Sequence, residues 1–145
     1  MEKIEGFHNQ FDFLSNFVPA RVILDGVAYP TVEHAYQAAK SLDVNERIII
    51  EKARGPGQAK KLGQLLTCRE DWEDIKERVM FELLIQKFGK SPFLEQLLAT
   101  GDAYIEETNW WKDTYWGVCN GKGKNRLGHL LMEIRAHIKE IMEGR

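Results

Sequence analysis

The chain has 145 residues, of which 43% are hydrophobic, and these values suit one globular domain with a buried core and argue against two. Its 20 basic and 22 acidic residues exclude a broad positive surface of the kind that binds nucleic acid without sequence preference. The two cysteines, Cys68 and Cys119, are too few and too far apart for a disulfide-stapled secreted scaffold or a closed zinc site, so a reducing cytoplasm is expected.

No segment has the character of a signal peptide or a membrane span. The first five residues lack an apolar core, and apolar runs such as Ile48 to Ile50 are far too short to cross a bilayer. A soluble protein without membrane association is therefore predicted. The absence of repeats, low-complexity stretches and flexible linkers predicts a single domain over residues 1–145.

The first predicted element is a short β-hairpin within residues 21–29, which turns at Asp25-Gly26. A helix is then expected from Thr31, the predicted N-cap residue. The residues expected on its core-facing stripe are Val32, Ala35, Ala39 and Leu42. Further helices are expected over about 45–54 and about 57–66, separated by Gly55-Pro56-Gly57.

Residues 70–89 form the clearest amphipathic segment and predict the longest buried helix. A short helix near 91–99 follows, and then a strand over 103–107 that is expected to return to the small sheet. Asn125 is expected to cap the last helix, whose inward residues would be Leu127, Leu130, Leu131, Ile134, Ile138 and Ile141. The pattern predicts a mostly helical α+β fold, a single compact domain with a small, short-stranded β element.

Three polar side chains share one face of the helix that begins after Thr31. Glu33 and Lys40 lie about 20° apart around the helix axis, with Tyr36 between them. They lie beside the apolar stripe, where either the wall of a cleft or a solvated, salt-bridged face is expected. Glu33 is in the first turn, where the helix dipole favours an ionised carboxylate. This suits a base, or an anion that stabilises an oxocarbenium ion, better than a general acid.

A glycine-rich segment, Asn120-Gly121-Lys122-Gly123-Lys124-Asn125, precedes the last helix. Its backbone N–H groups, two amines and the following helix N-terminus suit a phosphate, but a plain turn explains it equally well. Of the tryptophans at 110, 111 and 116, at least two are expected in the core, and Trp116 is expected to stack on a base. The histidines lack metal-ligand spacing, so His34 and His129 are predicted to be structural and no metal is predicted.

Several segments, in order along nearly the whole chain, together resemble the NADAR superfamily, especially its YbiA-like N-glycosidases. The segments are Phe13 to Phe17, Asp25-Gly26, Tyr29 to Lys40, Trp72, Lys76 to Met80, Lys87-Phe88, Tyr115 to Gly117, Gly121 to Gly128 and Leu131-Met132. The resemblance implies a compact, mostly helical fold that hydrolyses the C–N bond between ribose and a base, without metal or nicotinamide cofactor.

The resemblance also implies roles for individual residues. Glu33 would be the catalytic carboxylate, with Trp72 and Trp116 as further active-site residues. The residues expected to bind substrate are Ser15, Asn16, Tyr36, Lys40, Gly121, Lys122, Gly123, Lys124 and Asn125. Similar bacterial sequences often carry an acidic residue after the Trp-Gly pair, where this chain has Val118-Cys119. Asp113 or Asp102 is therefore a candidate for a second carboxylate.

The predicted substrate is a small phosphorylated ribosyl compound, a ribosylamino-pyrimidine phosphate from the early steps of riboflavin biosynthesis. One alternative is removal of ADP-ribose from guanine in DNA by an antitoxin, although the near-neutral charge argues mildly against a DNA partner. The other alternative is a non-catalytic module that binds ADP-ribose or a related nucleotide.

Overall fold

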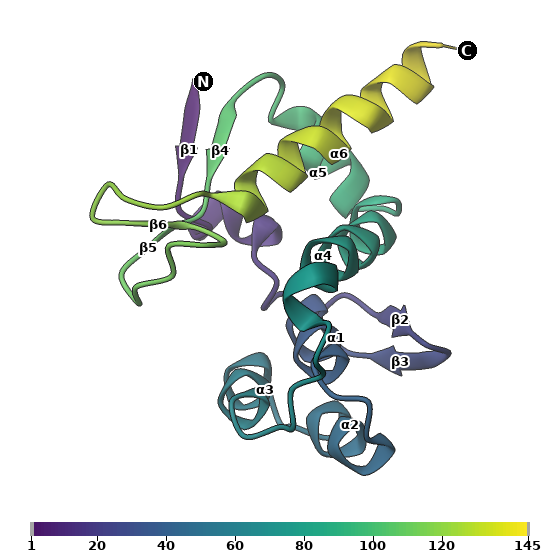
Figure 1. Ribbon diagram of the computed structural model, residues 1–145. Helices are drawn as coiled ribbons and strands as arrows, with labels where there is room; N and C mark the ends of the chain where they lie inside the picture. The colour runs from purple at the N-terminus through teal and green to yellow at the C-terminus, as the bar shows by residue number, and fades with distance from the viewer. Residues whose placement is uncertain (1, 145) are drawn as a thin grey trace. The chain divides into compact units, whose positions relative to one another are not determined.

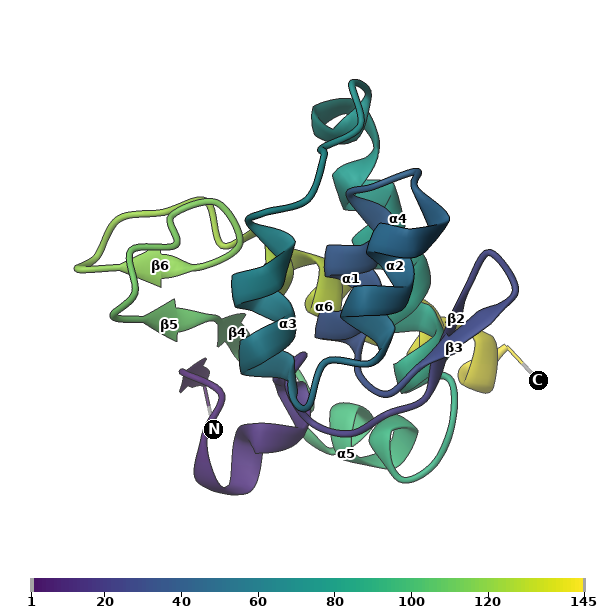
Figure 2. The same ribbon diagram turned by 90° about the horizontal axis from the view of Figure 1, so that it is seen from below.

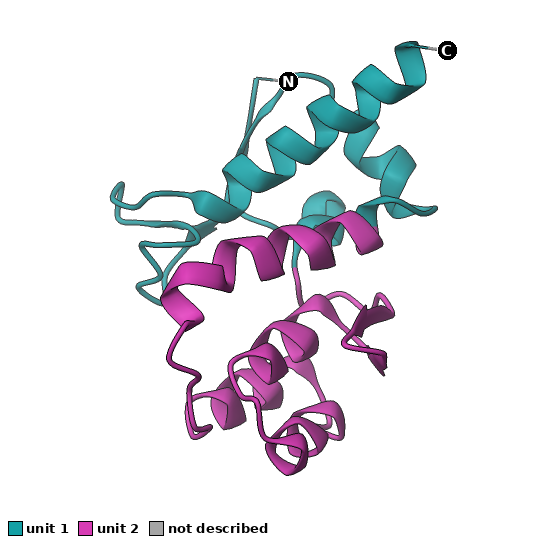
Figure 3. Cartoon of the chain, turned by 45° about the vertical axis from the view of Figure 1, so that its right-hand side comes forward, with its two compact units in different colours: residues 1–15, 88–145 teal, residues 16–87 magenta. Residues whose placement is uncertain are grey.

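A computed structural model describes residues 2–144, which form two compact units (Figure 3). Unit 1 combines residues up to 15 with those from 88 onward, and unit 2 consists of residues 16–87. Neither boundary has the composition of a linker, and the second falls at the last residue of a helix. Composition therefore could not indicate the two units, and the expectation of a single domain stays a prediction.

Unit 2 begins with the predicted hairpin. Strands β2 (Val22–Leu24) and β3 (Val27–Tyr29) pair antiparallel. Asp25 and Gly26 both have positive φ angles, 48° and 82°, as a two-residue turn of type I′ requires. The predicted hairpin and its turn are confirmed.

Four helices complete unit 2: α1 (Val32–Ala39), α2 (Val44–Glu51), α3 (Pro56–Gly63) and α4 (Trp72–Phe88). Helices α1, α2 and α3 pack against one another, and α1 also contacts the hairpin (Figure 2). Every residue of α1 is buried, although the helix contains glutamate, histidine and glutamine. A helix buried on all sides must give its polar side chains partners inside the protein.

The cap of α1 forms as predicted, because Oγ1 of Thr31 accepts a hydrogen bond from the His34 N–H at 3.0 Å. The predicted apolar stripe is wrong at its end. Helix α1 stops at Ala39, so Leu42 lies beyond it and is 67% exposed. Periodicity extended the stripe past the residue at which the chain leaves the helix.

Unit 1 contains two short pairs of parallel strands. Strand β1 (Lys3–Glu5) pairs with β4 (Tyr104–Glu106), and β5 (Thr108–Asn109) pairs with β6 (Val118–Cys119). The predicted strand at 103–107 is confirmed as β4, but the expectation that it returns to the sheet of the hairpin is wrong, because β4 lies in a separate two-stranded sheet. Its partner is β1, which was not predicted, because three residues are too few to show the alternation of a strand.

The helices of unit 1 are the 3₁₀ helix η1 (Asn9–Leu14), α5 (Phe93–Ala99) and α6 (Arg126–Glu143). Helix α6 packs on β4, and α5 contacts both η1 and α6 (Figure 1). The predicted inward face of α6 holds as far as Ile134, whereas Ile141 is 47% exposed near the end of the helix. The long helix expected over about 70–89 forms as α4, with 17 residues against the 18 of α6.

The expected fold class is confirmed, since the structure is mostly helical with short strands. Within residues 2–144 no helix combines the length and the apolar character needed to cross a membrane.

Candidate active site

Five predicted site residues come together around α1 in unit 2. They are Asn16, Glu33, Tyr36, Lys40 and Trp72, and are called the α1 cluster below. The Glu33 N–H donates to the main-chain oxygen of Asn16 at 3.2 Å. The ring centroids of Tyr36 and Trp72 are 5.1 Å apart, and Nζ of Lys40 lies 5.7 Å from the Tyr36 centroid. A carboxylate, a phenol, an indole and an amine therefore occupy one region of unit 2. The helical spacing predicted the carboxylate, the phenol and the amine, and the indole was expected from the family resemblance alone.

Glu33 is the buried carboxylate of the α1 cluster, with only 8% of its surface exposed. Its Oε2 accepts a hydrogen bond from Nε2 of Gln37, one turn further along α1, at 2.6 Å. It also lies in the first turn of α1, where the positive end of the helix dipole faces it. A charge-assisted hydrogen bond and the dipole both stabilise the ionised form that a general base needs.

Lys40, the last member of the cluster along α1, is a partly buried amine. Burial lowers the pKa of Lys40 below its ordinary value, and the neighbouring Glu33 carboxylate partly offsets that effect. The positive charges of Lys60 and Lys76 lower the pKa further. Lys40, Lys60 and Lys76 therefore repel one another, and a bound anion such as a phosphate would reduce this repulsion.

Asn16 supplies an unpartnered acceptor to the cluster. Its side chain is buried, and Nδ2 contacts the sulfur of Met80 at 3.5 Å. Its Oδ1 has no hydrogen-bond partner among residues 2–144. A buried carbonyl oxygen without a donor is costly, so this atom suits a hydroxyl donor of a bound sugar. Ser15, its predicted companion, directly follows η1 in unit 1, where its N–H donates to the Asp12 oxygen at 2.9 Å.

His34 has a structural role, as predicted. Its Nδ1 lies 2.7 Å from Oγ1 of Thr31, and its Nε2 lies 3.2 Å from the main-chain oxygen of Ala53. Both ring nitrogens are thus occupied inside unit 2. Within residues 2–144, no group of three or more histidine, cysteine, aspartate or glutamate side chains forms a metal-binding arrangement.

Trp116 belongs to a second group of predicted site residues, which lies in unit 1. Its ring meets the ring of Tyr115 edge to face, with centroids 4.9 Å apart, and Nζ of Lys124 lies 5.4 Å from the Tyr115 centroid. Oδ1 of Asp113 accepts hydrogen bonds from the N–H groups of Tyr115 and Trp116, at 3.1 and 2.9 Å. This carboxylate, a candidate for the second catalytic acid, is therefore engaged in shaping the turn before Trp116.

The other two tryptophans of unit 1 are not in the core. Trp110 is 83% exposed and Trp111 is 44% exposed, so the expectation that at least two of the three rings are buried is wrong. The loop that carries them is closed by Asn109, whose Nδ2 donates to the Asp113 oxygen and whose Oδ1 accepts from the Asp113 N–H. Lys112 has a φ angle of 66°, which turns the chain within the loop. These local bonds direct the loop outward.

The glycine-rich segment contains a tight turn. Asn120 and Gly121 have φ angles of 53° and 75°, and the main chains of Cys119 and Lys122 exchange hydrogen bonds across the turn. The next N–H groups, of Lys124, Asn125, Arg126 and Leu127, donate to the main-chain oxygens of Thr114, Gly117, Tyr115 and Trp116. The expectation that these backbone amides face a phosphate is therefore wrong, and the exposed amines of Lys122 and Lys124 are the groups that can reach one.

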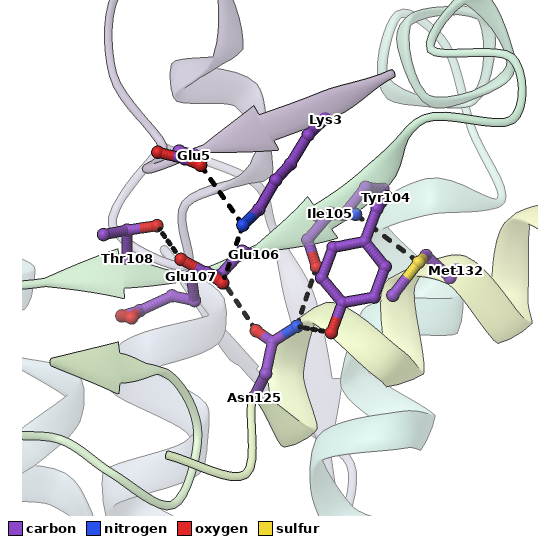
Figure 4. A network of polar contacts seen from close by, with 9 residues as sticks. All are labelled: Lys3, Glu5, Tyr104, Ile105, Glu106, Glu107, Thr108, Asn125 and Met132. Atoms are coloured by element: carbon purple, nitrogen blue, oxygen red, sulfur yellow. Dashed lines mark hydrogen bonds and ion pairs between the residues drawn. The ribbon is translucent and has the colours of Figure 1, made fainter. Parts of the chain in front are cut away.

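Asn125 does not cap α6 with its side chain, contrary to the prediction. Its backbone is left-handed, with a φ angle of 51°, and its amide is directed toward β4 (Figure 4). Nδ2 donates to the Ile105 oxygen at 2.9 Å and to the Tyr104 hydroxyl at 3.3 Å, and Oδ1 accepts from the Glu107 N–H at 2.9 Å. The side chain connects the start of α6 to β4, so its predicted contact with substrate finds no support in the geometry.

Glu107 is a buried carboxylate that sequence reasoning missed. Its Oε2 accepts a hydrogen bond from Nδ2 of Asn109 at 2.8 Å, and a Cβ at Gly117 would overlap both this oxygen and the Glu107 main-chain oxygen. The two-residue period of a strand puts Glu107 on the same face as buried Ile105, and this signal could have found it. Asp102, the remaining candidate for a second carboxylate, is exposed and lies 3.9 Å from the Lys139 amine.

Comparison with known proteins adds four findings. The model of the NADAR domain matches residues 3–139. The chain is 43% identical over 129 residues to N-glycosidase YbiA of Shigella flexneri serotype 5b (strain 8401), covering 86% of this chain and 79% of that one. It is 38% identical over 132 residues to riboflavin biosynthesis protein VVA0006 of Vibrio vulnificus (strain YJ016), covering 88% of this chain and 36% of that one. The NMR structure of Escherichia coli YbiA matches with a TM-score of 0.86 at 36% identity, covering all of this chain and 90% of that one.

Proposed function

The chain belongs to the NADAR domain family and is an N-glycosidase with a role in riboflavin-related metabolism, and on this premise we propose that its substrate is a ribosylamino-pyrimidine phosphate. The enzyme hydrolyses an N-glycosyl bond. The single observation that carries the proposal is the α1 cluster, where the buried carboxylate of Glu33 lies near the amine of Lys40. These are the two charges that hydrolysis of a phosphorylated ribosyl compound requires: an anion for the sugar carbon and a cation for the phosphate.

In the proposed reaction the bond between the anomeric carbon of ribose and the exocyclic nitrogen breaks. Its electron pair leaves with the base, whose nitrogen takes up a proton from solvent. This proton is replaced when Glu33 releases to solvent the proton that it later receives from water. The ribose carbon acquires positive charge in the transition state, and the Glu33 carboxylate stabilises it. A water molecule then bonds to the carbon and transfers its proton to Glu33. The products are the free aminopyrimidine and ribose phosphate, with all atoms of the water accounted for.

Binding groups complete the proposal. In unit 2, Oδ1 of Asn16 accepts a ribose hydroxyl, Lys40 contacts the phosphate, and the rings of Tyr36 and Trp72 form an aromatic wall. Unit 1, taken by itself, offers the Trp116 ring for stacking on a base and the side-chain amines of Lys122 and Lys124 for an anion.

Neither alternative function has support. Because the chain is an N-glycosidase, a module that only binds nucleotides is excluded. The names of the relatives refer to N-glycosidases and to riboflavin biosynthesis and do not refer to DNA, so a DNA partner has no support.

The direct test is base release by the purified protein. A ribosylamino-pyrimidine phosphate should be split into free aminopyrimidine and ribose phosphate, both quantified by chromatography. Uridine monophosphate is the matched control, because its base is bonded through a ring nitrogen and should remain intact. Release from a guanine-ADP-ribosylated oligonucleotide alone would contradict the proposed substrate and favour the antitoxin alternative.

The lowered pKa of Lys40 predicts a particular dependence on pH. Lys40 loses its proton at a lower pH than an exposed lysine, so the KM for a phosphorylated substrate should start to rise at a correspondingly lower alkaline pH. Lys40→Met should raise KM roughly tenfold at pH 7, because a charge-assisted contact to phosphate is lost. Lys40→Arg should remove the alkaline rise, because guanidinium remains protonated throughout.

These constants should be measured by initial rates between pH 6 and about 10, a range chosen to span the titration of a perturbed lysine. Lys61→Arg, at an exposed lysine of α3, is the matched control and should retain the wild-type profile. An alkaline rise in KM that persists unchanged in Lys40→Arg would show that another group titrates and that Lys40 does not contact the phosphate.

A further inference from the structure

We infer that Gln37 is a positioning residue for the reaction, holding the Glu33 carboxylate in its catalytic orientation, and that Gly63 of α3 keeps the Gln37 amide in place. The inference rests on the proposed catalytic role of Glu33. The arrangement comprises three residues, Glu33 and Gln37 of α1 and Gly63 of α3, on two helices that pack against each other.

The contact between Gln37 and Glu33 is short and buried. The two residues are four apart on α1, one helical turn, and Nε2 donates to Oε2 at 2.6 Å. Their exposed fractions are 4% and 8%. Because an ionised carboxylate has only acceptors, the NH₂ group must be the part of the amide that faces it. The bond therefore restricts the carboxylate to one rotamer and favours its ionised form.

The other end of the same amide has no partner. Oε1 of Gln37 is buried and accepts no hydrogen bond from any residue between 2 and 144. A buried carbonyl oxygen in this state destabilises a fold, and an apolar side chain of similar length would avoid the cost. His34, the neighbouring polar residue of α1, has partners for both ring nitrogens. Stability does not explain a glutamine at position 37, whereas its single hydrogen bond to Glu33 does.

Gly63 is the third residue of this arrangement. A Cβ at this position would overlap Oε1 of Gln37, lie 2.7 Å from its Cδ and 3.1 Å from its Cβ. At Gly55 and Gly57, the other glycines beside or within α3, a Cβ would meet no atom of the described chain within 4 Å. The absence of a side chain is thus needed at position 63 specifically. There the backbone of α3 lies directly against the amide, and this close approach hinders the amide from turning away from Glu33.

Gln37→Met tests the inference, because methionine has a similar length but neither a donor nor an unpartnered oxygen. We expect kcat for base release to fall roughly a hundredfold, the size of effect that follows a displaced catalytic group. The KM should stay near the wild-type value, and the melting temperature should be unchanged or higher. The acidic limb of the kcat profile should move to higher pH, because the carboxylate loses the donor that favours its ionised form. Gln64→Met, at an exposed glutamine just after α3, is the matched control.

Gly63→Ala should lower kcat and move the same limb in the same direction while Gln37 is present. In a Gln37→Met background, Gly63→Ala should cause little further loss of kcat, because the amide that the new methyl group would displace is absent. Such non-additive losses of kcat would show that Gly63 acts through Gln37. A Gln37→Met enzyme that keeps the wild-type kcat and acidic limb would overturn the inference, as would parallel losses of kcat and melting temperature with an unmoved limb. Failure of the proposed function is separate, since it would appear as turnover retained in Glu33→Gln.

Discussion

Glu33→Gln should lower kcat for base release by about 10³-fold, with little change in KM. Glutamine keeps the size of the side chain but has no negative charge to stabilise the ribose carbon in the transition state, and it cannot accept a proton from water. In the proposed function the ground-state contacts to the phosphate and sugar come from other members of the α1 cluster, so binding should persist. An effect on kcat alone identifies an interaction made in the transition state.

The measurement compares initial rates of base release with isothermal titration of substrate into the inactive variant. Glu82→Gln is the matched control, because Glu82 is an exposed glutamate of α4 in the same unit. Wild-type turnover by Glu33→Gln would remove the carboxylate from the mechanism. A rise in KM at unchanged kcat would reassign Glu33 to substrate binding.

Gly128→Ala should lower the free energy of unfolding by about 3 kcal/mol, the upper part of the range for an overpacked site. A Cβ at this position of α6 would overlap the main-chain oxygen of Ile105 and lie 2.5 Å from Nδ2 of Asn125. Both atoms belong to the network that joins α6 to β4 (Figure 4). The strand and the asparagine amide cannot both retain their hydrogen bonds when the methyl group is present.

Urea denaturation followed by circular dichroism measures this loss. Gly57→Ala is the matched control, since a Cβ there would meet no described atom within 4 Å and alanine favours a helix by about 0.5 to 1 kcal/mol over glycine. Equal unfolding midpoints for Gly128→Ala and the wild-type protein would show that α6 can move away from β4 without cost.

Helix α1 was accessible to sequence reasoning because its determinants are local. A cap at Thr31, the first-turn position of Glu33 and the helical spacing to Lys40 depend only on neighbouring residues, and the structure has each of them. The turn at Asp25-Gly26 is local in the same sense. Trp72 was expected at the active site from family resemblance alone, and its contact with Tyr36 came from the structure.

The wrong predictions concern polar groups that could form hydrogen bonds with either local or distant partners. Asn125 stands at the position of a cap, and only the folded structure directs its amide to Ile105, 20 residues away. The backbone amides that follow it seemed open to phosphate, yet they donate to carbonyl oxygens of the preceding loop. A sequence specifies which donors exist but does not specify which acceptors the fold brings to them.

The sequence by itself determined the helical face that carries Glu33, Tyr36 and Lys40, because helical geometry repeats every few residues and a cap is a local bond. Only the tertiary structure decided the parallel pairing of β1 with β4, the orientation of Asn125, and the enclosure of Gln37 by Gly63. Each of these three features requires two segments far apart along the chain to come close together. The packing of the whole unit sets that approach, and the residues of the two segments alone do not.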